Sequence, residues 1–280
     1  MDSSLARFAD DLDLAGRSPS TKRIYLAAAH DLAAFHDRSP SQLGADDVRA
    51  WVQALRGRGL SPQRVRHHLS ALKFLYAKTL GLPGTVSFLS FPKDRQRLPT
   101  VLSVDEVRRL LAAVREPKFR VFFAFLYATG LRLGEACAVQ TCDIDAERGL
   151  LRVRAGKTHT ERAVALTPAL IQTLRTYWRF VRPSPPWLFA SRRETPLCPG
   201  VARNALRSAA QIAGLRCRVT PHVLRHAYAT HALEAGTDLR IIQVTLGHRS
   251  IRSTARYASV SLEMLSKTPS PFDRLGFRIW

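Results

Sequence analysis

Acidic residues are scarce in this chain. Its 280 residues include 22 Asp and Glu against 43 Lys and Arg, which gives a formal net charge of +21 at pH 7. A surplus of this size produces a positive field that attracts polyanions. We therefore expect a nucleic acid partner, although charge alone does not separate DNA from RNA or from an anionic membrane surface.

Cysteine is also sparse, and no apolar run approaches the length of a membrane span. The four cysteines, at positions 137, 142, 198 and 217, contain no CxxC pair, so they indicate neither a disulfide framework nor a zinc site. The N-terminal stretch MDSSLARFADDLDLAG is acidic where a signal peptide is basic. These features predict a soluble protein of the reducing cytoplasm, without a membrane partner.

The chain does have enough apolar sequence, 46% of its residues, for two domains with cores of their own. The first part, residues 1–81, reads as a set of helices, because Ile24, Leu26, Leu32 and Phe35 recur at spacings of three and four. We therefore expect a helical N-terminal domain.

A further helix of this region begins at Ser61 and Pro62, an N-cap followed by a proline at the first helical position. It carries a row of basic and imidazole side chains: Arg64, Arg66, His67, His68 and Lys73. Such a row can be a solvated face, but few acids interrupt it, which favours contact with DNA.

Residues 82–99 interrupt the helical pattern and predict a linker. They contain Pro83, Gly84, Pro92, Pro99 and the basic run KDRQR. A second domain, residues 100–280, then opens with Ser103 and Glu106, which have the spacing of a capping box.

The second domain is expected to be mainly α with a small β-sheet. Residues 119–128 are almost continuously apolar, which predicts a buried helix ended by Gly130. The stretches LLRVR and RAVAL alternate apolar and polar residues, which predicts a β-hairpin with Gly156 and Lys157 at or near its turn. Helices are predicted from there to about residue 258.

Several residues of this domain have side chains that could take part in catalysis. Thr220 and Pro221 begin a helix on which His222 and Arg225 share a face, close to helix-start amides that favour an anion. His248 follows a helix that ends at Gly247. Arg132, Lys157 and Tyr257 complete the set. Taken singly, each is more typical of a solvated side chain, a cap or a packed tyrosine.

Together these residue types fit phosphoryl transfer, in which positive groups neutralise charge on the non-bridging oxygens. Arginine grips two oxygens and stays charged, and histidine donates hydrogen bonds or moves a proton near neutral pH. A lysine protonates a leaving oxygen, and a tyrosine hydroxyl attacks to form a covalent intermediate. The combination predicts an enzyme that acts on a phosphodiester.

Four stretches resemble, in the same order, the motifs of the tyrosine recombinase family, the integrases and Xer-type recombinases of bacteria and their mobile elements. They are ATGLRLGEA, VRAGKTHTERAVAL, TPHVLRHAYATHALEAGTDLRIIQVTLGH and SIRSTARYASV. In addition, SPSTKRIYLAAAHDLAAF and LSPQRVRHHLSALKFLY are similar to the family's helical, SAM-like core-binding domain. The resemblance implies a two-domain clamp on double-stranded DNA with a C-terminal catalytic domain.

The resemblance also implies roles at the phosphate. Arg132 and Arg225 match the family's phosphate clamp, and His248 matches a residue that hydrogen-bonds the phosphate. Glu135, in LRLGEA, is similar to a position of structural support.

For the covalent step, the resemblance makes Tyr257 the nucleophile that holds the 3′-phosphate, with His222 assisting proton transfer. Lys157 is implied as the general acid to the leaving 5′-hydroxyl. Its surroundings depart from the family pattern, which commonly has glycine after the lysine and a basic residue shortly beyond; here Thr158 and Thr160 occupy this region.

A phosphotyrosine link conserves the energy of the phosphodiester, so the resemblance implies neither ATP nor a metal, and the sequence has no P-loop or metal-carboxylate cluster. We expect no cofactor. Recombination is expected to need a homotetramer on two DNA sites, in a protein associated with the bacterial nucleoid. The tail from about residue 262 ends in apolar residues that dock either on a neighbouring protomer or on their own domain: Phe272, Leu275, Phe277, Ile279 and Trp280.

Three other functions remain open. His222, His226 and His231 suggest a metal enzyme, although HVLRH lacks the glutamate of a zinc-hydrolase motif. A DNA-binding regulator that kept the fold and lost catalysis is the second, although no catalytic residue type is missing. A type IB topoisomerase also uses a tyrosine, but the residue order resembles recombinases more closely.

Overall fold

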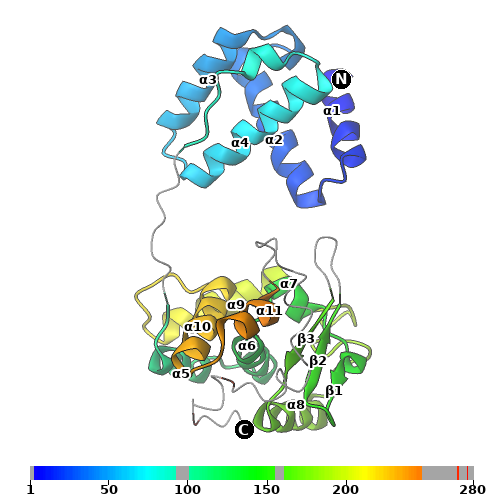
Figure 1. The fold of residues 1–280 in the computed structure, drawn as a ribbon, viewed down its shortest axis with the longest axis vertical. Helices are drawn as coiled ribbons and strands as arrows, with labels where there is room; N and C mark the ends of the chain where they lie inside the picture. Colours follow the sequence, from blue (N-terminus) through cyan, green and yellow to red (C-terminus); the bar gives the residue numbers. More distant parts are fainter. Residues whose placement is uncertain (1–2, 93–100, 155–160, 248–269, 271–275, 277–280) are drawn as a thin grey trace. The chain divides into compact units, whose positions relative to one another are not determined.

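The structure is a computed structural model of the whole chain, and it describes residues 3–92, 101–154, 161–247, 270 and 276 (Figure 1). The chain divides into two compact units, Met1–Arg97 and Leu98–Trp280. Each unit has its own hydrophobic core. The expected two-domain, mainly α architecture with a small sheet is therefore confirmed.

The described part of the N-terminal unit is helical. Its α-helices are α1 (Ser3–Leu14), α2 (Pro19–His36), α3 (Ala45–Gly57) and α4 (Pro62–Phe74). Shorter turns connect or extend them: η1 (Pro40–Gln42), η2 (Leu75–Thr79) and η3 (Pro83–Val86). The side-chain oxygen of Ser61 accepts a hydrogen bond from the Arg64 amide, so the predicted start of α4 is confirmed.

The core of this unit is built around Trp51 and Tyr76, whose polar ends are satisfied by Asp31 and the Pro40 carbonyl at 3.0 and 2.9 Å. The apolar pattern that predicted α2 is only partly directed inward. Leu32 is fully buried, whereas Ile24 and Phe35 are exposed, and the small residues Ala28 and Ala29 let α2 pack closely instead.

The predicted linker differs from the structure at its beginning. Pro83 opens the η3 turn, and Val86 and Leu89 are buried in the N-terminal core. The proline and glycine that indicated a linker here form a compact turn, which brings the following apolar residues back onto the helices. The division between the two units falls between Arg97 and Leu98, and residues 93–100 lie outside the described residues.

The C-terminal unit combines helices with a three-stranded antiparallel sheet of order β1-β2-β3 (Figure 1). Its strands are β1 (Ile144–Asp145), β2 (Leu150–Val153) and β3 (Arg162–Ala165). In the register of β2 with β3, Leu151 lies opposite Val164. Its helices are α5 (Val104–Ala112), α6 (Pro117–Thr129), α7 (Leu133–Cys137), α8 (Pro168–Val181), α9 (Pro199–Ile212), α10 (Pro221–Glu234) and α11 (Leu239–Leu246), with the short turn η4 (Thr141–Asp143).

Helix α6 forms the centre of this unit. Residues 121–128 are all buried, and Phe122 packs edge-on against Phe189 with ring centroids 5.0 Å apart. Gly130 ends the helix with φ +61°, and a Cβ there would lie 2.5 Å from the Tyr228 ring. The buried helix, its glycine end and the capping box of Ser103 with Glu106 are all confirmed.

Among the described residues, no helix is long and apolar enough to cross a membrane. Part of the tail can be placed: Ser270 is buried, and its hydroxyl donates to the Ala128 carbonyl of α6 at 3.4 Å. The apolar residues at positions 272, 275, 277, 279 and 280 lie outside the described residues, so their docking partner stays a prediction.

Candidate active site

The site is built where four helices end or begin. Helix α6 ends at Gly130, and after Leu131 the chain turns into α7 with Arg132 at its N-cap. The Arg132 amide donates to Glu135 Oε2 at 2.8 Å, and its guanidinium donates to Glu135 Oε1 at 3.0 Å. Glu135 therefore fixes both the backbone and the side chain of Arg132.

Helix α10 supplies the second arginine. Thr220 caps this helix through its hydroxyl, and Pro221 occupies the first turn, as predicted. Arg225, one turn further, is only 3% exposed. Its guanidinium donates to the Gly130 carbonyl at 2.8 Å and to the Leu246 carbonyl at 2.6 Å. Arg225 therefore ties the end of α6 to the end of α11.

The end of α11 gathers three arginines. Its last carbonyls lack partners within the helix. Thr245 O accepts from Arg162 at 2.8 Å, Leu246 O accepts from Arg225 at 2.6 Å, and Gly247 O accepts from Arg132 at 2.9 Å. Gly247 ends the helix with φ +61°, as predicted, and it directly precedes His248. The negative end of the helix dipole therefore faces three positive side chains.

The charges of this cluster shift the pKa values of its members. Burial alone would raise the pKa of Glu135, but hydrogen bonds and positive charge from Arg162 and Arg132 outweigh burial and hold this pKa at about 2. Burial, reinforced by the charge of Arg132, lowers the pKa of Arg225 to about 10. Both side chains therefore remain charged at neutral pH, with Glu135 as the carboxylate that Arg132 and Arg162 share.

His222 lines a groove together with Arg132 and Arg225. Burial, the neighbouring His226 and the charges of Arg225 and Arg132 lower the pKa of His222, which favours its neutral imidazole at pH 7. His222 therefore suits proton transfer better than permanent charge pairing.

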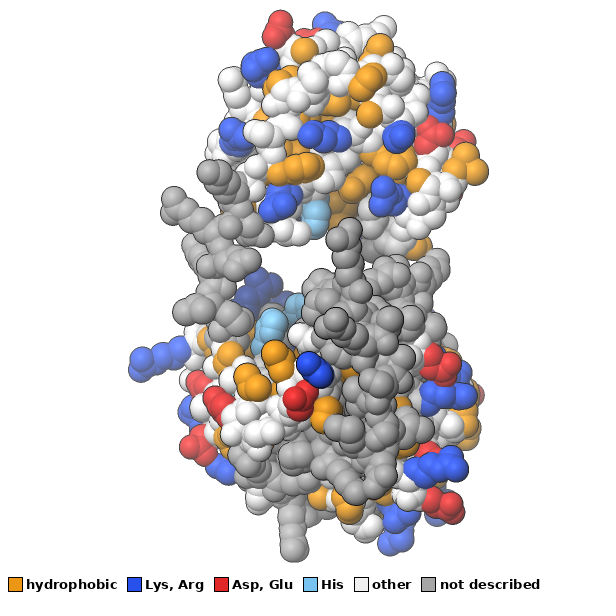
Figure 2. Space-filling view, in the orientation of Figure 1, with side chains coloured by type: hydrophobic (Ala, Val, Ile, Leu, Met, Phe, Trp, Pro, Cys, Tyr) orange, Lys and Arg blue, Asp and Glu red, His pale blue; other side chains and the backbone are white. Residues whose placement is uncertain are grey.

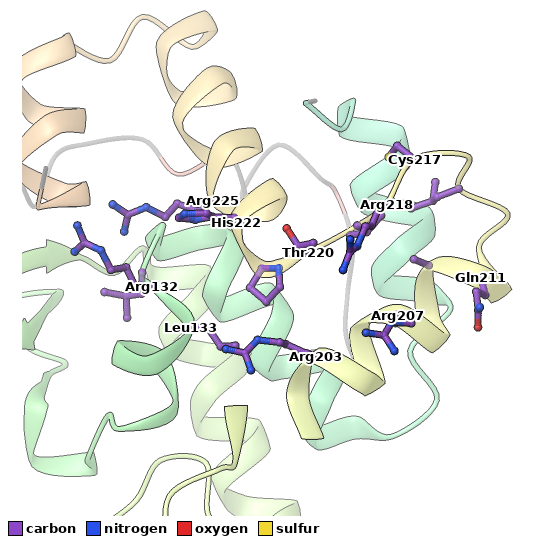
Figure 3. Close-up of a pocket in the computed structure, with 15 residues that line it drawn as sticks. Arg132, Leu133, Arg203, Arg207, Gln211, Cys217, Arg218, Thr220, His222 and Arg225 are labelled. Atoms are coloured by element: carbon purple, nitrogen blue, oxygen red, sulfur yellow. The ribbon is translucent and has the colours of Figure 1, made fainter. Parts of the chain in front are cut away.

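The groove has a volume of about 740 Å³. Beyond Arg132, His222 and Arg225, it is lined by three more arginines that the sequence did not single out: Arg203, Arg207 and Arg218. Figure 3 shows Arg203 and Arg207 on α9 and Arg218 in the segment before α10, around the space beside the His222 ring. The spacing of four between Arg203 and Arg207 places both on one helix face, a signal that the sequence did contain.

Arg162 is a further arginine beside the site that the sequence did not single out. It lies at the start of β3 with its side chain 7% exposed, and its guanidinium contacts both oxygens of Glu135. The predicted hairpin strands are confirmed as β2 and β3. Lys157 falls between them in residues 155–160, which lie outside the described residues, as do His248 and Tyr257.

The basic residues expected to contact DNA from α4 stay a prediction. Arg64 is exposed, and the cationic groups of Arg66 and Lys73 lie 5.8 and 4.9 Å from the centre of the Phe91 ring. His67 lies within 3.3 Å of the Gln63 amide. Figure 2 shows Lys and Arg side chains spread over the visible face of the N-terminal unit, interleaved with hydrophobic ones.

The metal alternative is not supported by the described residues, among which no group of three or more His, Cys, Asp or Glu is arranged to hold an ion. The His222 and His226 rings lie 5.6 Å apart. His231 is instead buried in the core, where its Nδ1 shares a hydrogen bond of 2.8 Å with the Tyr127 hydroxyl.

Comparison with known proteins agrees with this geometry. Residues 100–264 match the phage integrase family, and residues 5–84 match its N-terminal SAM-like domain. A putative integrase/recombinase of Sinorhizobium fredii, y4qK, is 37% identical over 96% of this chain and 88% of its own length. The tyrosine recombinase XerA of Pyrococcus furiosus is 35% identical over 94% of this chain and 91% of its own length.

Solved structures give the same fold. A crystal structure of XerA recombinase covers 99% of both chains with a TM-score of 0.52 and 27% identity. A lambda integrase tetramer bound to a Holliday junction covers 89% of this chain and 77% of its own, with a TM-score of 0.75 and 21% identity. With a family match over more than half of its length and full-length relatives above 30% identity, this chain belongs to the phage integrase family of tyrosine recombinases.

Proposed function

We propose that this recombinase cleaves and rejoins double-stranded DNA at specific sites through a covalent 3′-phosphotyrosine link to Tyr257. The observation that carries the proposal is the convergence of Arg132, His222 and Arg225 on one groove. Two fixed arginines and a neutral histidine at one groove suit an in-line attack on a phosphodiester, because they can neutralise phosphate charge and move a proton.

The arginines are positioned before a phosphate arrives. A guanidinium has five N–H donors, and the carbonyls and carboxylate that hold Arg132 and Arg225 use only some of them. The remaining donors are available for non-bridging phosphate oxygens. Because the neighbouring backbone already fixes both side chains, little side-chain entropy is lost when they bind.

In the proposed reaction, the Tyr257 hydroxyl attacks the phosphorus while its proton passes towards His222. The bond from phosphorus to the 5′-oxygen breaks, and Lys157 protonates that oxygen. Arg132, Arg225 and His248 neutralise charge on the phosphate during the step. A free 5′-hydroxyl from another strand then attacks the phosphotyrosine, which releases Tyr257 and reseals DNA without ATP.

The arginine-lined groove supports a DNA substrate. Arg203 and Arg207 on α9, with Arg218 in the segment before α10, extend the positive lining of the groove beyond the pair of clamping arginines. Phosphates of one strand follow each other closely, so a row of arginines suits contact with several of them. We propose that these three arginines bind phosphates that flank the cleaved one.

The decisive experiment is covalent trapping. DNA protected by the bound protein is sequenced to identify the site, and a nicked version of that site is incubated with the protein. The expected result is a covalent adduct mapped to Tyr257. Tyr257→Phe should bind the same DNA and give no adduct, whereas an adduct of equal yield from this variant would exclude Tyr257 as the nucleophile.

The same material tests the competing functions. We propose a tetramer on two sites, and the lambda integrase tetramer on a Holliday junction is a structural neighbour that supports this arrangement. Strand exchange should therefore require two sites in the reaction. Relaxation of a supercoiled plasmid with one site would indicate a topoisomerase, and sequence-specific binding without any adduct would indicate a regulator.

A further inference from the structure

Arg162 is a buried cation that the proposed reaction does not yet use. It enters the cluster from the sheet, whereas the clamping arginines come from the segment before α7 and from α10. Its side chain is 7% exposed, and a charge at this depth is costly unless it is paired. The pairing is nearly ideal: two parallel bonds to Glu135, at 3.1 and 2.8 Å, and a bond of 2.8 Å to the Thr245 carbonyl.

Glu135 is consequently shared between two arginines. Its Oε1 accepts from the guanidinia of Arg132 and Arg162, and its Oε2 accepts from the Arg132 amide and from Arg162. If Arg162 were absent, Glu135 would keep its hydrogen bonds to Arg132 alone, and its negative charge would act most strongly there and more weakly on Arg225. Arg132 would then be largely neutralised within the protein and would attract a phosphate less strongly.

We propose that Arg162 is a positioning residue for strand cleavage, because it neutralises Glu135 and so leaves the charge of Arg132 available for the phosphate. The proposal rests on the proposed function, since it concerns the same phosphate. Glu135 then has a definite role, which is to orient Arg132 without cancelling its charge.

The geometry adds a second connection, to the end of α11. A Cβ added at Gly247 would lie 3.0 Å from an Arg162 terminal nitrogen and 3.1 Å from its guanidinium carbon. The guanidinium therefore packs directly against the backbone that precedes His248. Through Thr245 and Gly247, Arg162 ties strand β3 to the helix end that accepts Arg132.

The test separates charge neutralisation from mere packing. Adduct formation on the nicked substrate is measured in single turnovers at saturating protein, for Arg162→Gln, Glu135→Gln and the double variant. Arg162→Gln should slow the step about 10- to 100-fold, the usual effect of losing a charge-assisted contact. Adding Glu135→Gln should recover at least about fivefold, because the uncompensated carboxylate is removed.

Arg162→Lys and a matched control complete the design. Lysine keeps the positive charge next to Glu135 but loses the two parallel guanidinium hydrogen bonds. The cleavage rate of Arg162→Lys should therefore exceed that of Arg162→Gln and approach that of the wild type. Arg152→Gln removes an arginine from the neighbouring strand, where the side chain is 59% exposed and pairs with Glu161 and, at 3.8 Å, with Asp143. Asp143 keeps its closer ion pair with Arg154, so this variant should leave the rate unchanged. Thermal unfolding checks that each variant folds.

Each outcome decides one claim. If the double variant is as slow as Arg162→Gln, or slower, Arg162 acts through packing and the proposal is wrong. If wild-type protein forms no adduct, the proposed function fails. The charge argument is then tested by affinity for the same DNA, which Arg162→Gln should weaken and Glu135→Gln in that background should restore.

Discussion

Among the described glycines, Gly130 leaves the least room for a Cβ atom, and substituting it gives a quantitative test of the packing beside the site. Gly130 has φ +61°, a conformation that costs a residue with a Cβ about 1 kcal/mol. In Gly130→Ala the new Cβ would also lie 2.5 and 2.8 Å from atoms of the Tyr228 ring and 2.9 Å from Leu246. Relief of such overpacking costs a further 1 to 3 kcal/mol or so, which makes the total about 2 to 4 kcal/mol.

Gly214→Ala is the matched control. Gly214 has φ +65°, almost the same backbone conformation, but an added Cβ would meet no atom within 4 Å. It should therefore cost only the backbone contribution, about 1 kcal/mol. The difference between the two variants isolates the clash with Tyr228 and Leu246, independent of the cost of a positive φ.

The assay is urea unfolding followed by hydrogen exchange of peptides, which reports the two units separately. Peptides from α6 and α10 should lose protection at clearly lower urea in Gly130→Ala than in Gly214→Ala, whereas peptides from α1–α4 should be unchanged. Equal losses in both variants would refute the packing argument. Adduct formation should fall as well in Gly130→Ala, because the Gly130 carbonyl holds Arg225.

Three further predictions concern charge. Plotted as the logarithm of the DNA-binding constant against the logarithm of the salt concentration, binding by Arg207→Gln should fall with a slope shallower by about 0.9 than that of the wild type. Arg193→Gln, which lies outside the groove, should leave the slope unchanged. The pKa of Glu135 is held at about 2 in the folded protein, against an ordinary value of 4.5, so its ionised form contributes up to about 3 kcal/mol to the free energy of unfolding above pH 4.5. This contribution is lost as the pH falls towards 2. In Glu135→Gln, the free energy of unfolding should therefore decrease less steeply over this acid range. Burial lowers the pKa of His231, which shares a hydrogen bond with Tyr127, so the free energy of unfolding should fall as the pH decreases below about 6.5. The fall should be smaller in His231→Gln. Equal pH profiles of the two proteins would contradict this.

The sequence predicted those parts of the fold that depend on local signals. The Ser61 cap, the capping box at Ser103 and the glycine ends of α6 and α11 all involve residues within one helical turn of each other. The apolar run of α6 marked the core because it is buried on every side. The strand β1 was not predicted, since two residues are too few to show an alternation.

The site was predicted less completely because its contacts are distant in sequence. Arg162 contacts Glu135 across 27 positions and Thr245 across 83, and on a hairpin strand an arginine indicates a solvated face. The exposure of Ile24 and Phe35 shows that sequence spacing has the same limit, because the spacing that predicts a helix does not say which of its apolar side chains a neighbouring element buries. Only the tertiary structure distinguishes a buried cation from a surface one.

Charge balance explains how these arginines stay together. Arg132, Arg162 and Arg225 with Glu135 carry a net charge of roughly +2, and the C-terminal ends of α6 and α11 each offset it by roughly 0.5 through their carbonyls. Among the described residues, about one positive charge of this cluster remains uncompensated. Under the proposed function, the phosphodiester supplies one negative charge, so the cluster is nearly neutral only when DNA is bound.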